Sequence, residues 1–111
     1  MNEHSQILLP EAFADIYRSR PGSARLVLPL ADVAARHELC EDLAQALTEH
    51  ARAMLVGAHL AEDEVVHGVV AGLRAPDAGV GDAEAIWVVR RLAELLDWEQ
   101  PAGPEFLPEA K

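Results

Sequence analysis

Three side chains with metal-binding chemistry lie close together in the segment "RHELCED". His37 stands three residues before Cys40, and Glu41 follows Cys40 directly. Imidazole, thiolate and carboxylate groups are common zinc and iron ligands, and a histidine near a cysteine can lower the pKa of the thiol. The spacing therefore raises the hypothesis of a metal- or redox-responsive site at His37, Cys40 and Glu41.

The same three residues also fit an ordinary amphipathic helix. From Leu30 to about Val56, positions at steps of three and four form one stripe: Val33, His37, Cys40, Ala44, Leu47, Ala51 and Met54. Free cysteine is among the most buried residue types, so we expect Cys40 in the core and His37 at the stripe's border. This structural interpretation is favoured and predicts neither a metal nor a cofactor, with the metal site kept as an alternative.

Two further patterns test for enzyme activity. Glu64 and His67 have the Glu-x-x-His form of di-iron bundles, but such sites need that motif on two helices and the chain has one copy. A phosphate-binding loop needs a lysine after its glycines, and the one lysine of the chain is Lys111. We therefore assign no catalytic residues and expect a non-enzymatic protein.

The hydrophobic periodicity predicts an all-α fold, a small three-helix up-down-up bundle with a short extra N-terminal helix and a disordered C-terminal tail. The long helices are expected from Leu30 to about Val56, from Ala61 to before Pro76, and from Asp82, as N-cap, to about Asp97. The expected regions are an N-terminal arm with the short helix (1–29), the helical bundle (30–98) and the disordered tail (99–111).

Composition and charge narrow the classes of partner. The 111 residues carry a formal net charge of −10, which disfavours nucleic acid and anionic membranes as partners. The start of the chain has neither a basic segment nor a long apolar run, so we expect no secretory signal and no membrane span. A single cysteine precludes an internal disulfide and fits a reducing compartment. We expect a cytoplasmic bacterial protein.

Residues that face away from the predicted core are the best candidates for binding. Trp87, Arg91, Glu94 and Trp98 fall at i, i+4, i+7 and i+11, on the side of the last helix opposite Val89 and Leu96. Tryptophan and arginine are enriched at binding hot spots, so this stripe is the predicted partner-binding surface. In the alternative interpretation, residues 1–29 fold back and cover the two indole rings.

A second face consists of small residues and is a possible oligomer contact. Ala61, Gly68, Gly72 and Ala75 lie within about 60° of one another on the middle helix. Small side chains permit close approach of a helix from another subunit. Two glycines also weaken a helix by roughly 1 kcal/mol each, so an exposed and merely weak helix is the alternative.

Three segments together resemble a known group of proteins: "RHELCEDLAQALTEHARAML", "EDEVVHGVVAGL" and "AEAIWVVRRLAELLDW", preceded by "ILLPEAF". The chain is similar over most of its length to short proteobacterial proteins that are often labelled ATPases with chaperone activity. We interpret the label as a transferred name, because the missing lysine argues against autonomous ATP hydrolysis. The resemblance implies at most an accessory or adaptor role beside an ATP-driven machine.

Overall fold

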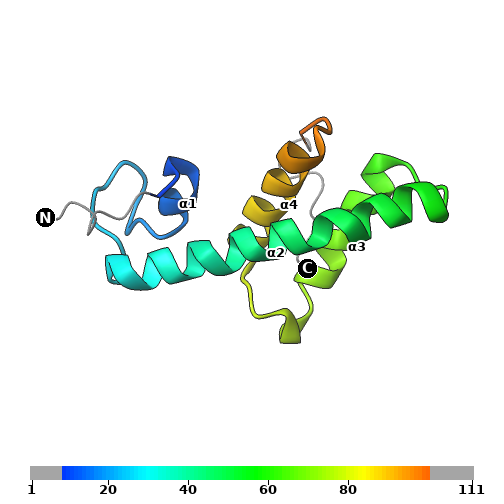
Figure 1. Cartoon of the computed structure of the whole chain (residues 1–111). Helices are drawn as coiled ribbons and strands as arrows, with labels where there is room; N and C mark the ends of the chain where they lie inside the picture. Colours follow the sequence, from blue (N-terminus) through cyan, green and yellow to red (C-terminus); the bar gives the residue numbers. More distant parts are fainter. Residues whose placement is uncertain (1–8, 101–111) are drawn as a thin grey trace, which may run out of the picture. The chain divides into compact units, whose positions relative to one another are not determined.

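A computed structural model describes residues 9–100, which form a small all-α bundle as the periodicity predicted. The helices are α1 (Glu11–Ile16), α2 (Leu30–Gly57), α3 (Glu62–Leu73) and α4 (Asp82–Leu96), with a short 3-10 turn η2 (Pro76–Ala78) before α4 (Figure 1). Within the described residues, extended pairing is limited to one isolated antiparallel bridge between Arg18 and Leu26. The predicted long helices are therefore present in the expected order.

The chain divides into two compact units, and the boundary lies inside α2. The first unit ends at Leu39 and the second begins at Cys40. The first turns of α2 thus group with the N-terminal arm, whereas the sequence pattern placed the start of the bundle at Leu30. Most of the predicted tail, 99–111, lies outside the described residues, as do residues 1–8.

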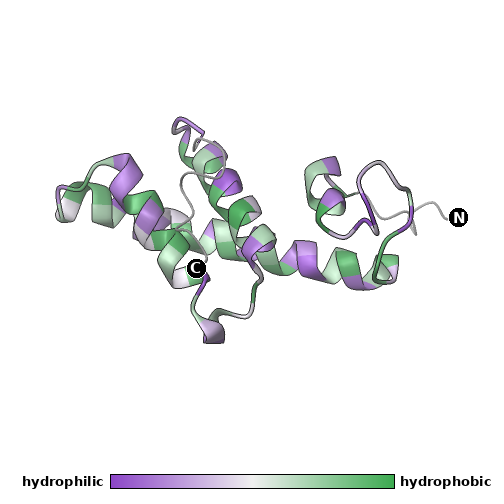
Figure 2. Ribbon diagram, turned by 180° about the vertical axis from the view of Figure 1, so that it is seen from behind, coloured by the Kyte–Doolittle hydropathy of each residue, from purple (hydrophilic) through white to green (hydrophobic). Residues whose placement is uncertain are grey.

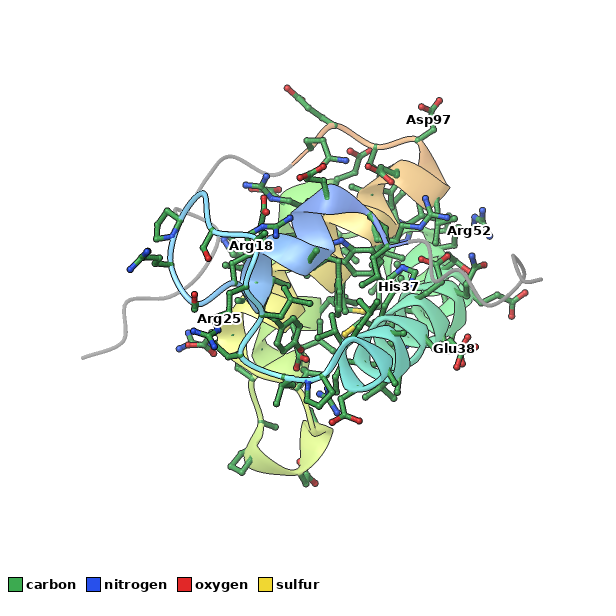
Figure 3. The ribbon with its side chains drawn as sticks, turned by 90° about the vertical axis from the view of Figure 1, so that its left-hand side faces the viewer. Arg18, Arg25, His37, Glu38, Arg52 and Asp97 are labelled. Carbon is green, nitrogen blue, oxygen red and sulfur yellow. The ribbon has the colours of Figure 1, made fainter. Side chains whose placement is uncertain are left out.

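The first unit is built around Phe13, which is completely buried. Its ring lies 5.6 Å from that of Tyr17 and meets the ring of His37 edge-on at 5.2 Å. Figure 3 shows His37 on the side of α2 that faces α1, whereas Glu38 points away from it. Edge-to-face packing is a favourable arrangement of aromatic rings, so this contact fixes α1 against the start of α2.

The loop between α1 and α2 folds back on itself through backbone hydrogen bonds. The amide of Val27 donates to the carbonyl of Tyr17 at 2.7 Å, and the amide of Ser19 donates to the carbonyl of Arg25 at 2.8 Å. Arg18 forms an ion pair with Asp15 at 2.6 Å, so its charge is neutralised locally. These bonds hold residues 17–27 in a narrow ribbon, too short to found a sheet.

The core of the second unit is formed by small and branched side chains from three helices. Figure 2 shows how hydrophobic and hydrophilic residues alternate along these helices. The buried apolar residues are Cys40, Ala44 and Ala51 of α2, Val65, Val66, Val69, Val70 and Leu73 of α3, and Ala85, Val88, Val89, Leu92 and Ala93 of α4. The expected core position of Cys40 is thus confirmed.

Two helix ends differ from the sequence expectation. The first long helix was expected to end at about Val56, but Gly57 is still helical, and the positive φ of 56° that follows the helix belongs to His59. Asp82 was expected to be the N-cap of α4, but Gly81 holds that position and Asp82 is the first helical residue. Asp82 is instead bound by Arg74, whose Nε lies 3.1 Å from its carboxylate. That ion pair links the end of α3 to the start of α4.

The starts of α3 and α4 are stabilised in the same way. The carboxylate of Glu64 accepts the amide of Ala61 at 2.8 Å, and that of Glu84 accepts the amide of Gly81 at 2.9 Å. In each case the glutamate is the third helical residue and binds the N-cap backbone, which is one half of a capping box. Glu64, half of the Glu-x-x-His pattern, therefore has a structural role.

Candidate functional site

The candidate binding site centres on Arg91, which α4 presents toward α2. Its Nε and Nη2 donate to the two carboxylate oxygens of Glu41 at 2.8 and 3.0 Å, and its Nη1 donates to Glu94 at 3.0 Å. Gln45 donates to the same Glu41 carboxylate at 2.8 Å. A forked arginine–carboxylate pair fixes the orientation of both side chains, so the guanidinium is held in one position.

The same contacts set the charge of the site. The hydrogen bond that Arg91 donates to Glu41, followed by the one it donates to Glu94, raises the pKa of Arg91 above its ordinary value, while partial burial acts in the opposite direction. The Arg91 and Glu41 side chains remain 34% and 25% exposed. Arg91 is therefore a permanently charged group that is both fixed in place and reachable from solvent.

The two tryptophans lie at different kinds of position. Trp87 is half-buried on α4, one turn before Arg91. Trp98 is also half-buried, but α4 ends at Leu96 and Asp97 adopts the left-handed conformation. The amide of Trp98 donates back to the carbonyl of Ala93 at 2.8 Å, and that of Asp97 to the carbonyl of Glu94 at 3.2 Å. This pair of bonds is a Schellman motif.

The Schellman motif changes the predicted stripe. The i+11 spacing assumed that the helix continues through position 98, and that assumption is wrong. Trp87, Arg91 and Glu94 do share α4, with Glu94 59% exposed, whereas Trp98 follows the turn that ends the helix. The stripe therefore consists of three helical residues and one residue of the C-terminal turn, and its role in binding stays a prediction.

The small-residue face is also shorter than expected. Ala61 is the N-cap of α3 and Ala75 is the N-cap of η2, which leaves Gly68 and Gly72 within the helix. Both glycines are exposed. A Cβ added to Gly68 would lie 3.5 Å from the Met54 Cε, and one added to Gly72 would meet nothing within 4 Å. Neither glycine is required by packing among residues 9–100, and the oligomer contact stays a prediction.

The alternative metal site receives no support from the geometry. His37 is half-buried against Phe13, Cys40 is fully buried, and Glu41 is bound by Arg91. Among residues 9–100, no three histidine, cysteine, aspartate or glutamate side chains form a group that could hold a metal ion. His37, Cys40 and Glu41 are thus close in sequence, but their side chains make three different contacts and do not converge on one site.

Sequence reasoning missed the partner of Arg91. Glu41 lies fifty positions earlier in the chain and was considered only in relation to His37 and Cys40. The sequence did contain a signal for this ion pair. Glu41 is an acidic residue at the border of one apolar stripe, and Arg91 is a basic residue at the border of another. Opposite charges at such borders are candidates for an ion pair between helices.

Comparison with known proteins identified no relative of this chain. No protein-family model matches the chain, and searches of curated proteins and of solved structures find no match either. In the part of the chain that the structure describes, no helix is long and apolar enough to cross a membrane.

Proposed function

We propose that this protein is a non-enzymatic helical interaction module that binds a protein partner through Trp87, Arg91, Glu94 and Trp98. An adaptor or chaperone-accessory role in the bacterial cytoplasm is the version that the resemblance implies. One observation carries the proposal. Arg91 is held by the carboxylates of Glu41 and Glu94, and the half-exposed indole of Trp87 lies on the same helix as Arg91. The second indole, that of Trp98, lies at the turn that follows this helix.

Fixed side chains favour binding because less conformational freedom is lost when the partner arrives. Arg91 has its three nitrogens engaged, yet a third of its side chain is open to solvent. A partner can therefore stack on the guanidinium face or pair with Glu94 without breaking the bonds to Glu41. Indole rings add large contact area with few rotatable bonds. A partner with aromatic and basic side chains suits this surface.

The proposal is tested by capturing partners from the native host with the tagged full-length chain and repeating the capture with two variants. Trp87→Ala removes an indole from the helix. Trp98→Leu removes the other indole but keeps an apolar residue after Asp97, where the Schellman turn favours one. Each variant should reduce the captured partner at least tenfold, as expected for loss of a hot-spot side chain.

The matched control removes exposed apolar side chains elsewhere. Leu30→Ala and Leu39→Ala alter residues that are 46% and 38% exposed and lie outside the stripe. Both should retain the partner at the wild-type level, and all four variants should keep the wild-type helical circular dichroism. Equal capture by folded Trp87→Ala and wild-type protein would show that the stripe is not the binding surface.

A further inference from the structure

Two surface regions outside the tryptophan stripe carry exposed apolar side chains and opposite charges. The first, here called the arm loop, comprises residues 20–28. Val27 is 62% exposed in it and Leu28 is 38% exposed. In Figure 2 the loop is coloured as hydrophobic where it enters α2. Apolar side chains of this size so far out of the core commonly mark an interaction site when they adjoin one another.

The arm loop is basic, although the protein as a whole is strongly acidic. The chain has three arginines and no acidic residue between Asp15 and Asp32. Arg18 is neutralised by Asp15 and Glu11. Arg20 and Arg25 are exposed and form no ion pair within the described residues, and Figure 3 shows Arg25 pointing outward. The loop therefore presents two exposed positive charges near Val27 and Leu28.

The second region, here called the α2–α3 corner, comprises residues 56–63. Val56 at the end of α2 is 72% exposed, the highest value among the exposed large apolar side chains of the described chain. Glu62 and Asp63 in the first turn of α3 are exposed. Within residues 9–100 neither is in an ion pair, whereas Glu64 beside them binds the Ala61 amide. The corner thus combines an exposed apolar side chain with two exposed negative charges.

We propose that the arm loop of one copy of this chain docks on the α2–α3 corner of a second copy. Both regions carry exposed apolar side chains that can be buried together, and the arginines of the arm loop complement the carboxylates of the corner. Electrostatic complementarity of this kind selects a partner and fixes the register of binding. A second copy is also the one partner certain to present the matching region at the concentration of the protein itself.

Charge reversal on the full-length chain tests this docking. The wild type should self-associate in sedimentation velocity at low salt, and raising NaCl from about 50 to 500 mM should weaken the association, because exposed charge pairs are screened. Arg20→Glu with Arg25→Glu should raise the dissociation constant at least tenfold, and Glu62→Arg with Asp63→Arg should do the same. Mixed in equal amounts, the two reversed proteins should associate again.

Controls separate this contact from general charge effects and from the proposed function. Arg90→Glu on α4 and Asp77→Arg in η2 also reverse exposed charges, and they should leave self-association unchanged. Trp87→Ala should do so as well, because the tryptophan stripe is not part of this contact. A wild type that stays monomeric at low salt, or reversed variants that fail to associate when mixed while remaining helical, would overturn the proposal.

Discussion

Arg91 is the residue whose observed contacts differ most from those that the sequence predicted. The spacing on α4 marks it as a solvent-facing binding residue, but its guanidinium is bound by Glu41 of α2 as well as by Glu94. The pair is half-buried, so removing one partner should cost more than it does in an exposed ion pair and less than in a fully buried one. Arg91 therefore helps to hold two helices together while it remains open to a partner.

Replacing Glu41 by Gln should lower the free energy of unfolding by about 1 kcal/mol, because the guanidinium loses a charged and forked partner. Glu94→Gln is the matched control on the same guanidinium. It should cost only a few tenths of a kcal/mol, because Glu94 is mostly exposed. Urea denaturation of both variants checks the difference. Equal losses of unfolding free energy would show that the bond between the helices contributes no more to stability than the exposed bond to Glu94.

The pH dependence of this pair follows from the direction of the Arg91 shift. A raised pKa means that the folded state favours the charged guanidinium, so its contribution is fully present below the unfolded-state pKa and is lost only above it. That window is strongly alkaline. Titration of Arg91 should therefore add no slope to the unfolding free energy between about pH 6 and 9.

At the scale of elements, α3 is the helix whose composition is least favourable. Gly68 and Gly72 lie on its exposed side, and neither supports a close approach by another part of the described structure. Its start depends on the Glu64 carboxylate, because Ala61 offers no side-chain acceptor. The helix is held mainly by its buried valines, which pack with α4.

Gly68→Ala should raise the free energy of unfolding by about 0.5 to 1 kcal/mol, and Gly72→Ala, in the last turn, by a smaller amount. The added methyl group meets ordinary contact at position 68 and open space at position 72. Thermal denaturation measures both effects. Gly72→Gln distinguishes the two interpretations of this face: an oligomer contact would be broken by the larger side chain, whereas an exposed helix would keep its mass in sedimentation.

The sequence predicted elements better than it predicted their ends and contacts. The stripe of α2 is confirmed, because helical periodicity alone determines that Val33, Cys40 and Ala44 share a face. The spacing placed Val89 and Leu96 on the core side of the last helix. Val88 is buried as well, since α4 packs against α3 and is also bound by α2. A helical wheel gives one buried face and cannot show that a helix has two neighbours. The turn at Asp97 was missed because left-handed residues are usually glycine.

At the scale of the whole molecule, two compact units share the single helix α2. Each has buried side chains of its own: Phe13 in the first, and the valines and leucines of α3 and α4 in the second. The chain also has one tyrosine, Tyr17, which lies in the first unit, and two tryptophans, both in the second. Natural probes therefore distinguish the two units.

Unfolding followed by tryptophan fluorescence and by fluorine NMR of fluorotyrosine-labelled protein should give two different midpoints, because the units have separate cores. Phe13→Ala should shift the tyrosine transition, with a loss of about 3 kcal/mol or more for an aromatic side chain removed from a core. Leu92→Ala should shift the tryptophan transition instead. Coincident curves in the wild type and in both variants would show that the chain unfolds as one cooperative unit.

The burial of Cys40 has a practical consequence for studying this molecule. The one natural thiol is enclosed in the core, so thiol-directed labels should react with it slowly in the folded protein. Cysteines introduced at Ala12 of α1 and Arg90 of α4, exposed positions in the first and second units, can then carry spin labels without interference from Cys40. Pulsed electron resonance would give the distance between the units without deleting a core residue.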